Sequence, residues 1–259
     1  AVTSAVGMAH AGLHPVVAIY STFLNRAFDQ VLLDCALHKA GVTFVLDRAG
    51  ITGDDGPSHN GMWDLALTGI VPTLHVAAPR DGQQLRETLR EAIDISDAPS
   101  LIRFPKGAVN PDIPAFERRD GVDVLYRGES ADILLVSIGA FAGIAVEAAA
   151  QAYREGVGVT VIDPRWVKPL PKSLVTMAQR YKSVVVLEDG IKHGGIASTI
   201  SELFRESQLN VPVHSIGVPL TFLEHAKRIE ILEDLGITVQ NITRSLVDRK
   251  STRLNSSHR

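Results

Sequence analysis

Short runs rich in β-branched residues alternate with longer helical patterns along most of the 259-residue chain, and this alternation limits the fold more than any other feature. Parallel strands need a long crossover between them, which is usually a helix, so the alternation predicts parallel sheets covered by helices on both faces. The runs that predict strands are Val16–Tyr20, Val42–Leu46, Leu74–Ala77, Ser100–Phe104, Ile133–Ile138, Val159–Ile162, Ser183–Leu187 and Val213–Ile216. The helical patterns are Phe23–Leu37, Gln83–Ile93, Ile144–Tyr153, Ser173–Gln179, Ile196–Phe204, Lys227–Asp234 and Val239–Val247. The predicted fold class is therefore α/β with mainly parallel sheets.

A proline-rich stretch divides this pattern into two predicted domains. Residues 106–120 contain glycine and two prolines and end in a charged cluster, which is typical of a linker between domains. We predict two three-layer α/β domains, at residues 1–105 and 121–250. The polar end of the chain, residues 251–259, lacks a periodic pattern, and we interpret it as a non-native tail; the alternative is a natural disordered tail.

The first residues form an apolar run that begins at Ala1 with no Ser, Thr, Asp or Asn before it. Helices usually start at such a capping residue, because their first N–H groups need acceptors. We therefore expect the chain to begin inside a secondary-structure element.

The composition excludes several function classes. A formal net charge of -3 provides no electrostatic footprint for nucleic acid or for an anionic membrane surface. No apolar run approaches the ~18 residues that a membrane-spanning helix needs. The single cysteine, Cys35, excludes an intrachain disulfide framework and fits a reducing cytosol. We predict a cytoplasmic protein with neither nucleic-acid nor membrane partners.

Polar side chains gather just after the first two predicted strands. Tyr20 ends the first strand, and Arg48 follows the second, ahead of a glycine-rich loop that holds Asp55 and His59. Ligands bind at the carboxyl ends of the strands in open parallel sheets, so a site is expected here. The alternative is a solvated turn, since Asp and Gly form turns on local grounds alone. The chain has no P-loop, no G-x-G-x-x-G after a strand and no histidine spacing typical of a metal site, so we predict no metal ligand.

Two long segments of this region resemble the motifs of one enzyme family. The segment YSTFLNRAFDQ at residues 20–30 is similar to the Y-S-T-F-L-x-R-A-[FY]-D-Q motif of 1-deoxy-D-xylulose-5-phosphate synthases. The segment DRAGITGDDGPSHNG at 47–61 resembles their D-R-A-G-x-x-G-x-D-G-x-x-H-x-G loop. Further along, DPRWVKPL at 163–170 and EDGIKHGG at 188–195 resemble parts of the C-terminal domain of the same family. The resemblance extends from Ala1 to about Lys250.

The resemblance implies a transketolase-like pyrimidine-binding domain followed by a transketolase C-terminal domain. The family uses thiamine diphosphate and Mg²⁺, and it holds the diphosphate and the Mg²⁺ in a further, N-terminal domain that this sequence lacks. The family motif E-Q-H-A-V-T ends in the residues with which this chain begins. The glutamate that activates the cofactor is therefore expected three residues before Ala1.

The same resemblance gives roles to aromatic and basic side chains. It implies that Phe23 stacks on the aminopyrimidine ring of the cofactor, although a phenylalanine on a helix is otherwise usually a core residue. It implies that Tyr20, Arg26 and Arg48 hold the phosphate of glyceraldehyde 3-phosphate, a task that suits the planar guanidinium fork. Lys106 stands in RFPKG at 103–107 where many relatives have arginine, so it keeps the positive charge for the phosphate and loses the fork.

Asp55 and His59 match the acid and the histidine of the family's loop, which line the substrate site. Histidine moves protons near neutral pH, and a neighbouring carboxylate fixes its tautomer. The alternatives are a solvated loop histidine and a surface pair of Arg26 with an acid such as Asp29 or Asp55. In the second domain, the helix start after Gly195 offers N–H groups to an anion, although in the family that domain mainly supports the subunit interface.

The resemblance implies a parent enzyme that condenses pyruvate with glyceraldehyde 3-phosphate, releases CO₂ and feeds the synthesis of isoprenoids, thiamine and pyridoxal phosphate. Such enzymes are homodimers, and we predict that this chain alone has no synthase activity. Two alternatives share the same pair of domains: a transketolase and the β subunit of a 2-oxoacid dehydrogenase. A non-catalytic scaffold is a third alternative, although a scaffold has no need of a phosphate site.

Overall fold

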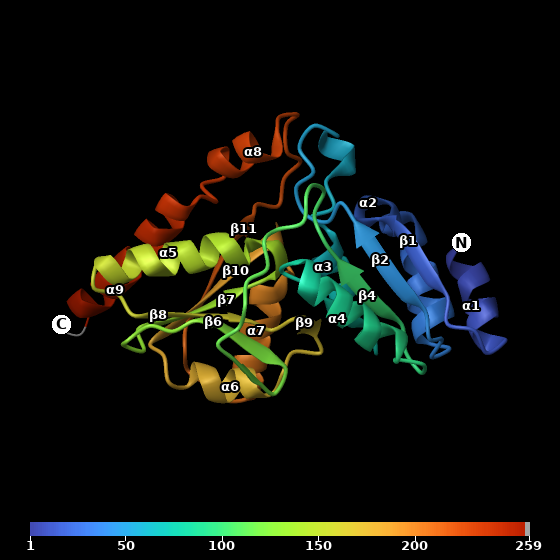
Figure 1. Cartoon of the computed structure of the whole chain (residues 1–259), viewed down its shortest axis with the longest axis horizontal. Coiled ribbons are helices and arrows are strands. Elements are labelled where there is room, and N and C mark those ends of the chain that lie inside the picture. Colours follow the sequence, from blue (N-terminus) through green and yellow to red (C-terminus); the bar gives the residue numbers. More distant parts are fainter. Residues whose placement is uncertain (257–259) are drawn as a thin grey trace.

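The computed structural model describes residues 1–256, and it consists of two α/β lobes that lie side by side (Figure 1). The elements of the first lobe are α1 (Val2–His10), β1 (Val16–Tyr20), α2 (Ser21–Leu24), η1 (Asn25–Ala27), η2 (Gln30–Ala36), β2 (Thr43–Asp47), η3 (Pro57–His59), α3 (Asp64–Gly69), β3 (His75–Ala77), α4 (Gly82–Ile93) and β4 (Ser100–Arg103). The remaining elements are β5 (Glu117–Arg119), β6 (Val122–Tyr126), β7 (Ile133–Ser137), η4 (Gly139–Phe141), α5 (Ala142–Arg154), β8 (Val159–Asp163), β9 (Trp166–Lys168), α6 (Ser173–Ala178), β10 (Ser183–Ile191), α7 (Ile196–Glu206), β11 (Val213–Val218), α8 (Arg228–Asp234) and α9 (Val239–Ser256).

Each lobe is built on its own sheet. The first sheet has the order β1-β2-β4-β3-β9, and its first four strands are parallel. The second sheet has the order β11-β10-β7-β8-β6-β5, in which β11, β10, β7 and β8 are parallel and β6 and β5 form an antiparallel edge. The predicted α/β fold class with mainly parallel sheets is confirmed.

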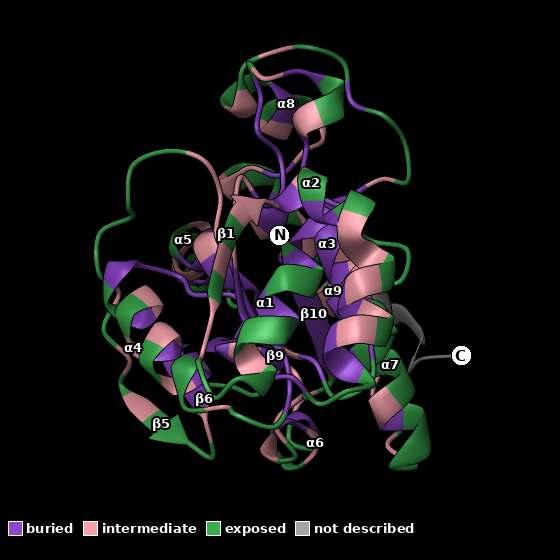
Figure 2. Cartoon of the chain, turned by 90° about the vertical axis from the view of Figure 1, so that its right-hand side faces the viewer, coloured by how far each residue is buried: buried purple, intermediate pink, exposed green. Residues whose placement is uncertain are grey.

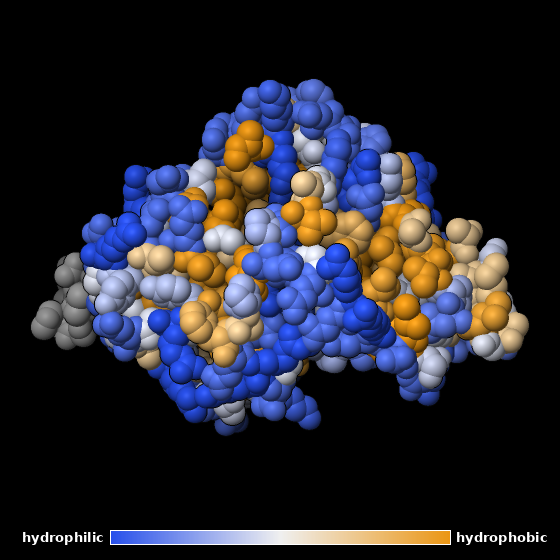
Figure 3. All heavy atoms as spheres, viewed as in Figure 1, coloured by the Kyte–Doolittle hydropathy of each residue, from blue (hydrophilic) through white to orange (hydrophobic). Residues whose placement is uncertain are grey.

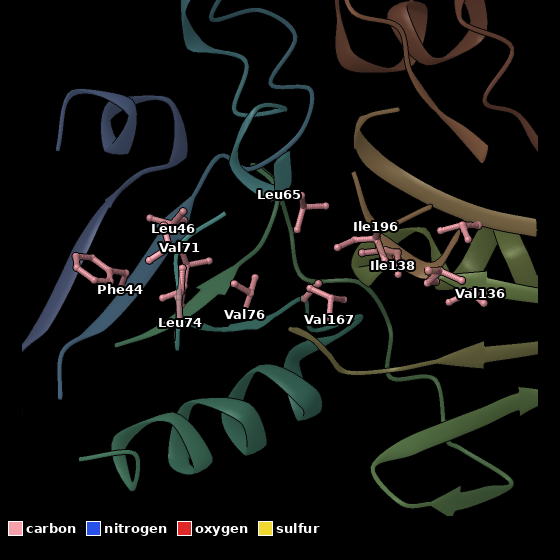
Figure 4. Close-up of a cluster of buried hydrophobic side chains, with 14 of the residues drawn as sticks. Phe44, Leu46, Leu65, Val71, Leu74, Val76, Val136, Ile138, Val167 and Ile196 are labelled. Atoms are coloured by element: carbon pink, nitrogen blue, oxygen red, sulfur yellow. The ribbon is translucent and has the colours of Figure 1, made fainter. Parts of the chain in front are cut away.

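A single hydrophobic core continues from one lobe into the other. Figure 4 shows buried side chains of β2, α3 and β3 in the first lobe and of β7 and α7 in the second along one band. Strand β10 is buried along its whole length (Figure 2), and α3 packs against both β10 and α7. On the far side of the second sheet, α5 and α9 cover a separate core. The contact between the lobes therefore contains a continuous apolar core.

Strand β9 ties the lobes together, because it follows β8 in the second lobe and pairs antiparallel with β3 in the first sheet. Its two end residues are also anchored in the first lobe. The Trp166 indole N–H donates to Glu91 at 2.6 Å, and Lys168 Nζ donates to the carbonyls of Thr68 and Gly69 at 3.0 and 2.7 Å. These carbonyls belong to the C-terminal turn of α3, and without Lys168 they would have no hydrogen-bond donor within the helix.

The eight predicted strands and seven predicted helical patterns all occur, with small shifts at their ends. One of the helical patterns is irregular. The pattern over Phe23–Leu37 predicts one helix, whereas the structure divides it into an α turn, a 3₁₀ turn and a π-helical stretch. The sequence analysis missed α3 and the short strands β5, β6 and β9. Strand β5 lies inside the predicted linker at 106–120, and the domain limits remain predictions.

The described part of the chain ends in a long helix. Helix α9 extends to Ser256, and the last three residues of the predicted tail at 251–259 lie outside the described residues. Within the part of the chain that the structure describes, no helix is both long and apolar enough to cross a membrane.

Candidate active site

The carboxyl ends of three neighbouring strands of the first sheet meet at one edge. Strand β2 lies between β1 and β4, and the register places Tyr20 beside Asp47 and Leu46 beside Arg103. The segments that follow these strands therefore leave the sheet at the same place. They carry six of the seven predicted site residues into one region: Tyr20, Phe23, Arg48, Asp55, His59 and Lys106.

An aromatic cluster forms one part of this site. The rings of Tyr20 and Phe23 are stacked with their centroids 5.3 Å apart, and His59 meets the Phe23 ring edge-on at 5.8 Å. The Arg48 guanidinium lies 3.9 Å from the centroid of the Tyr20 ring, which is a cation–π contact. Phe23 remains 45% exposed, so it is not a core residue; it presents ring surface to solvent.

A cluster of four charges forms the second part. Lys106 Nζ donates to Asp55 Oδ1 at 2.6 Å, Arg48 Nε lies 3.4 Å from Asp55 Oδ2, and Arg48 also pairs with Asp47. The hydrogen bond from Lys106 and the nearby positive charges hold the pKa of Asp55 below its usual value, so it is ionised at neutral pH. The two cations are balanced by two carboxylates. An incoming phosphate therefore has to take Arg48 and Lys106 away from these acids.

The loop that carries Arg48, Asp55 and His59 is held in an unusual shape by close backbone contacts. Arg48 has a φ of 60°, a left-handed conformation that costs a non-glycine residue energy and that is often found at functional sites. Ser21 Oγ donates to the Gly61 carbonyl at 3.0 Å, and an ideal Cβ at Gly61 would lie 2.3 Å from the Arg48 carbonyl oxygen. The end of the loop therefore packs against its start and against the first turn of α2.

A hollow of about 340 Å³ opens beside the charge cluster. Arg48 and Lys106 line it, together with Asp47 and residues at the start of α4 and along 104–110. Tyr20, Phe23, Asp55 and His59 are not among its lining residues, so the hollow does not include the aromatic cluster. The hollow thus has two cationic side chains, Arg48 and Lys106, in its wall.

The seventh predicted residue, Arg26, is not brought to the others. It lies in η1, exposed to solvent, and among the described residues no hydrogen bond or ion pair joins it to Asp29 or Asp55. The surface pairs considered for it are therefore not formed. Its contact with a phosphate remains a prediction.

Sequence reasoning missed a buried ion network beneath the site. Arg103, at the end of β4, is 2% exposed and donates to Asp64 at 2.7 Å and to Asp189 of the second lobe at 2.6 Å. Burial disfavours the charged guanidinium, but the two carboxylates hold the pKa of Arg103 above its usual value. Arg103 lies within the predicted strand Ser100–Phe104 and Asp189 lies in the EDGIKHGG segment, but nothing in the sequence shows that they meet.

The helix start after Gly195 is already occupied by a carboxyl group of the chain itself. Glu188 accepts hydrogen bonds from the backbone N–H groups of Ile196 and Ala197 at 2.7 and 3.1 Å, at the first turn of α7. An ideal Cβ at Gly195 would lie 2.5 Å from Glu188 Oε2, which leaves no room for a further ligand. The alternative of an external anion at this turn does not fit the structure, which agrees with a mainly structural role for the second domain.

Glu188 gives the protein a pH-dependent stability. Burial raises its pKa from 4.5 to about 7, so the folded chain holds this proton more tightly than the unfolded chain does. The stabilisation is complete below pH 4.5 and is lost as the pH rises through 7. Over that range we expect the free energy of unfolding of the wild type to fall by ~3 kcal/mol relative to Glu188→Gln, in urea titrations. The exposed Glu202→Gln variant is the control, and parallel pH profiles for wild type and Glu188→Gln would contradict the assignment.

Among the described residues, no group of three or more His, Cys, Asp and Glu side chains is arranged to hold a metal ion.

Comparison with known proteins gives the class that the fold and the site define. Residues 1–111 match the family "Transketolase, pyrimidine binding domain", and residues 123–242 match the family "Transketolase, C-terminal domain". The structure is similar to that of a "Split gene transketolase, inactive beta4 tetramer", with a TM-score of 0.83 and 26% sequence identity over 95% of this chain and 80% of that one. The molecule is thus a transketolase-type pair of domains.

The curated relatives narrow this class. The chain is 57% identical over 249 residues to the 1-deoxy-D-xylulose-5-phosphate synthase of Mycobacteroides abscessus and 56% identical over 248 residues to that of Rhodococcus jostii. It is 55% identical over 248 residues to that of Leifsonia xyli subsp. xyli. The chain belongs to the transketolase family, since the two domain models together match most of its residues, and it is similar to part of the 1-deoxy-D-xylulose-5-phosphate synthases of these bacteria. Each alignment covers 95% of this chain but only 38 or 39% of the relative.

Proposed function

We propose that this chain supplies the pyrimidine-binding and C-terminal domains of a 1-deoxy-D-xylulose-5-phosphate synthase, which condenses pyruvate with glyceraldehyde 3-phosphate and releases CO₂. The observation that carries the proposal is the paired cluster of Arg48, Lys106 and Asp55 beside the uncovered ring of Phe23, at the carboxyl ends of β1, β2 and β4. The product would enter isoprenoid, thiamine and pyridoxal phosphate synthesis. A cytoplasmic location is part of the proposal and is supported by the single, buried cysteine.

Thiamine diphosphate is the proposed cofactor, and the residues present fit its pyrimidine ring. The partly exposed ring of Phe23, backed by Tyr20, offers a flat apolar surface of the kind on which a heteroaromatic ring stacks. When bound, this cofactor supplies the carbanion chemistry that decarboxylation of a 2-oxo acid requires. The diphosphate and Mg²⁺ would be held by a separate diphosphate-binding domain.

The side chains of this chain would bind the acceptor and manage protons. Arg48 and Lys106 would turn from Asp47 and Asp55 to the phosphate of glyceraldehyde 3-phosphate, which offers each cation more than one charged oxygen. Asp55 is ionised and would then face the sugar. His59 lies against Phe23 and has its Nδ1 3.0 Å from Ser58 Oγ, so its Nε2 is the nitrogen available for proton transfer.

We further propose that the working enzyme is a homodimer that includes a diphosphate-binding domain. Large apolar side chains are exposed in the first lobe, and apolar surface gathers over this lobe in Figure 3, which supports burial against another chain. These exposed side chains are Met8, Leu13, Val16, Leu33, Leu37 and Ile70. The split-gene transketolase of similar fold is described as an inactive β4 tetramer. By the same reasoning, this chain alone would be inactive.

A second candidate is a separate β-type subunit of a split transketolase, and the similarity to the split-gene protein favours it. The identity of 26% to that protein, against 55 to 57% to the synthases, makes it the weaker candidate. The two candidates differ in the acceptor that they bind. Binding of a pentose phosphate in preference to glyceraldehyde 3-phosphate would favour the split transketolase.

The proposal is tested by binding of glyceraldehyde 3-phosphate to the full chain, measured by calorimetry. We expect Arg48→Ala to weaken binding by about 10- to 100-fold, because a hydrogen bond between charged groups is lost. The control is Arg205→Ala, which removes an exposed guanidinium that pairs with Glu202. Glycerol, which lacks the phosphate, is the matched ligand control. Absence of binding, or equal binding by wild type and Arg48→Ala, would refute the phosphate site.

A further inference from the structure

We propose that the segment 225–228 of the second lobe holds the loop 48–61 in its working position, with Arg228 as the main positioning residue. The inference rests on the proposed function, since that function places Arg48, Asp55 and His59 in the site. In Figure 1 the chain between β11 and α8 lies beside the site loop at the top of the molecule. The contacts between these two segments are specific and polar.

Two side chains of the second lobe bind backbone carbonyls of the loop. Arg228 Nη1 donates to the carbonyl of Ile51, and His225 Nε2 lies 3.0 Å from the carbonyl oxygen of Asp54, to which it donates as the Nε2–H tautomer. These carbonyls lie between Arg48 and Asp55, the two residues that make the ion pair of the site. Loop backbone groups are thus satisfied by side chains from a different lobe.

Two glycines let the loop approach the second lobe at van der Waals distance. Gly53 has a φ of +78°, and an ideal Cβ there would lie 2.4 Å from the backbone nitrogen of Arg228. Gly50 has a φ of +72°, and its Cβ would lie 2.3 Å from Asp189 Oδ2. No other residue type fits either position without displacing the loop or its neighbour. The loop glycines therefore serve contact with the second lobe as well as the turns of the loop.

Asp189 connects this contact to the strand beneath the site. Its Oδ1 accepts from Arg103 of β4 at 2.6 Å, while its Oδ2 lies 3.7 Å from Arg228 Nη2. Burial lowers the pKa of Arg228 despite the attraction of Asp189, and Arg103 adds repulsion, so the guanidinium is placed where its charge is costly. Such a placement is compensated by the bond to Ile51 and by the carboxylate.

Apolar packing also joins the loop to the second lobe, and Arg228 takes no part in it. A small apolar core joins Ile51 and Met62, next to or within the loop, to side chains of the second lobe. These are Ile191, Val218, Leu223 and Ile231. Arg228 is not part of this core, so we expect an Arg228 variant to keep the core and to fold with a loosened loop.

The test compares Arg228→Met, which removes the donors, with Arg228→Lys, which keeps a charged donor, in the full chain. Hydrogen exchange is measured on peptides that cover Ile51–Gly56. We expect exchange to be about 10-fold faster or more in Arg228→Met and close to wild type in Arg228→Lys, since the opened loop loses its partner groups. The exposed Arg205→Met variant is the matched control. Unchanged exchange in Arg228→Met, or equally fast exchange in both Arg228 variants, would overturn the proposal.

A second readout measures affinity for glyceraldehyde 3-phosphate beside the thermal midpoint. We expect affinity to fall by about 10-fold in Arg228→Met, with rescue by lysine, and the midpoint to change little. If the thermal midpoint falls in parallel with the affinity in both variants, the loss of affinity comes from a destabilised fold, and Arg228 has only a structural role. If the wild type fails to bind the sugar phosphate, the proposed function fails, whereas the exchange experiment still decides whether Arg228 positions the loop.

Discussion

Replacement of Arg103 by methionine is expected to lower the free energy of unfolding by roughly 3–5 kcal/mol, because it removes the cation of buried Asp64 and leaves buried Asp189 with the more distant guanidinium of Arg228, at 3.7 Å. Asp64 and Asp189 are each about as buried as Arg103. Burial already raises the pKa of Asp64 while the guanidinium is present. Loss of the guanidinium removes the charge that offsets this burial. Chemical denaturation followed by circular dichroism measures the effect.

The control for this variant separates the missing cation from the missing volume. Adding Asp64→Asn and Asp189→Asn to Arg103→Met removes both buried carboxylate charges, and we expect this triple variant to recover most of the lost stability. The exposed Arg205→Met variant is expected to change stability by no more than about 0.5 kcal/mol. A loss for Arg103→Met as small as that for Arg205→Met would show that the network is not a major stabilising contact.

Gly61→Ala is expected to abolish sugar-phosphate binding and to cost roughly 2–3 kcal/mol of stability, since the added methyl has no space. Its Cβ would lie 2.3 Å from the Arg48 carbonyl oxygen and 2.6 Å from the Ser21 Cβ. Neither is the end of a flexible side chain, so the loop itself has to move, and Arg48 moves with it. Calorimetric binding of glyceraldehyde 3-phosphate and urea denaturation measure the two effects.

Gly69→Ala is the matched control for this substitution. Gly69 ends α3 and has no heavy atom within 4 Å of an added Cβ, so alanine there is expected to be neutral or to stabilise by up to about 1 kcal/mol. Wild-type affinity in Gly61→Ala would mean that the loop is not held by the contact between its two ends.

The parts of the fold that the sequence predicted are those set by local patterns. β1 occurs over Val16–Tyr20 as predicted, because a short apolar run rich in β-branched residues is typical of a strand, even though β1 lies at the edge of its sheet and is only partly covered. Strand β9 has only three residues and no such pattern, and it pairs with a strand distant in the sequence. Its existence depends on the packing of the two lobes, which no local pattern encodes.

The candidate site shows the same division. The motif at 47–61 placed Arg48, Asp55 and His59 in one loop, and the strand-end rule placed that loop beside Tyr20. The residues that these side chains contact were not predictable, because the contacts join residues far apart in the sequence. Asp55 pairs with Lys106, and Arg228 donates a hydrogen bond to the Ile51 carbonyl. Arg26 belongs to the first motif but points to solvent, so a shared motif did not place it in the cluster.

The late position of β9 in the chain has a consequence for synthesis on the ribosome. After β4 has emerged, the edge of β3 stays open until β5 to β8 have been made and β9 arrives to close it. An unpaired edge invites pairing with other strands during that interval. The first lobe therefore completes its sheet only together with the second. Separate expression of the two lobes leaves the first with a permanently unprotected edge.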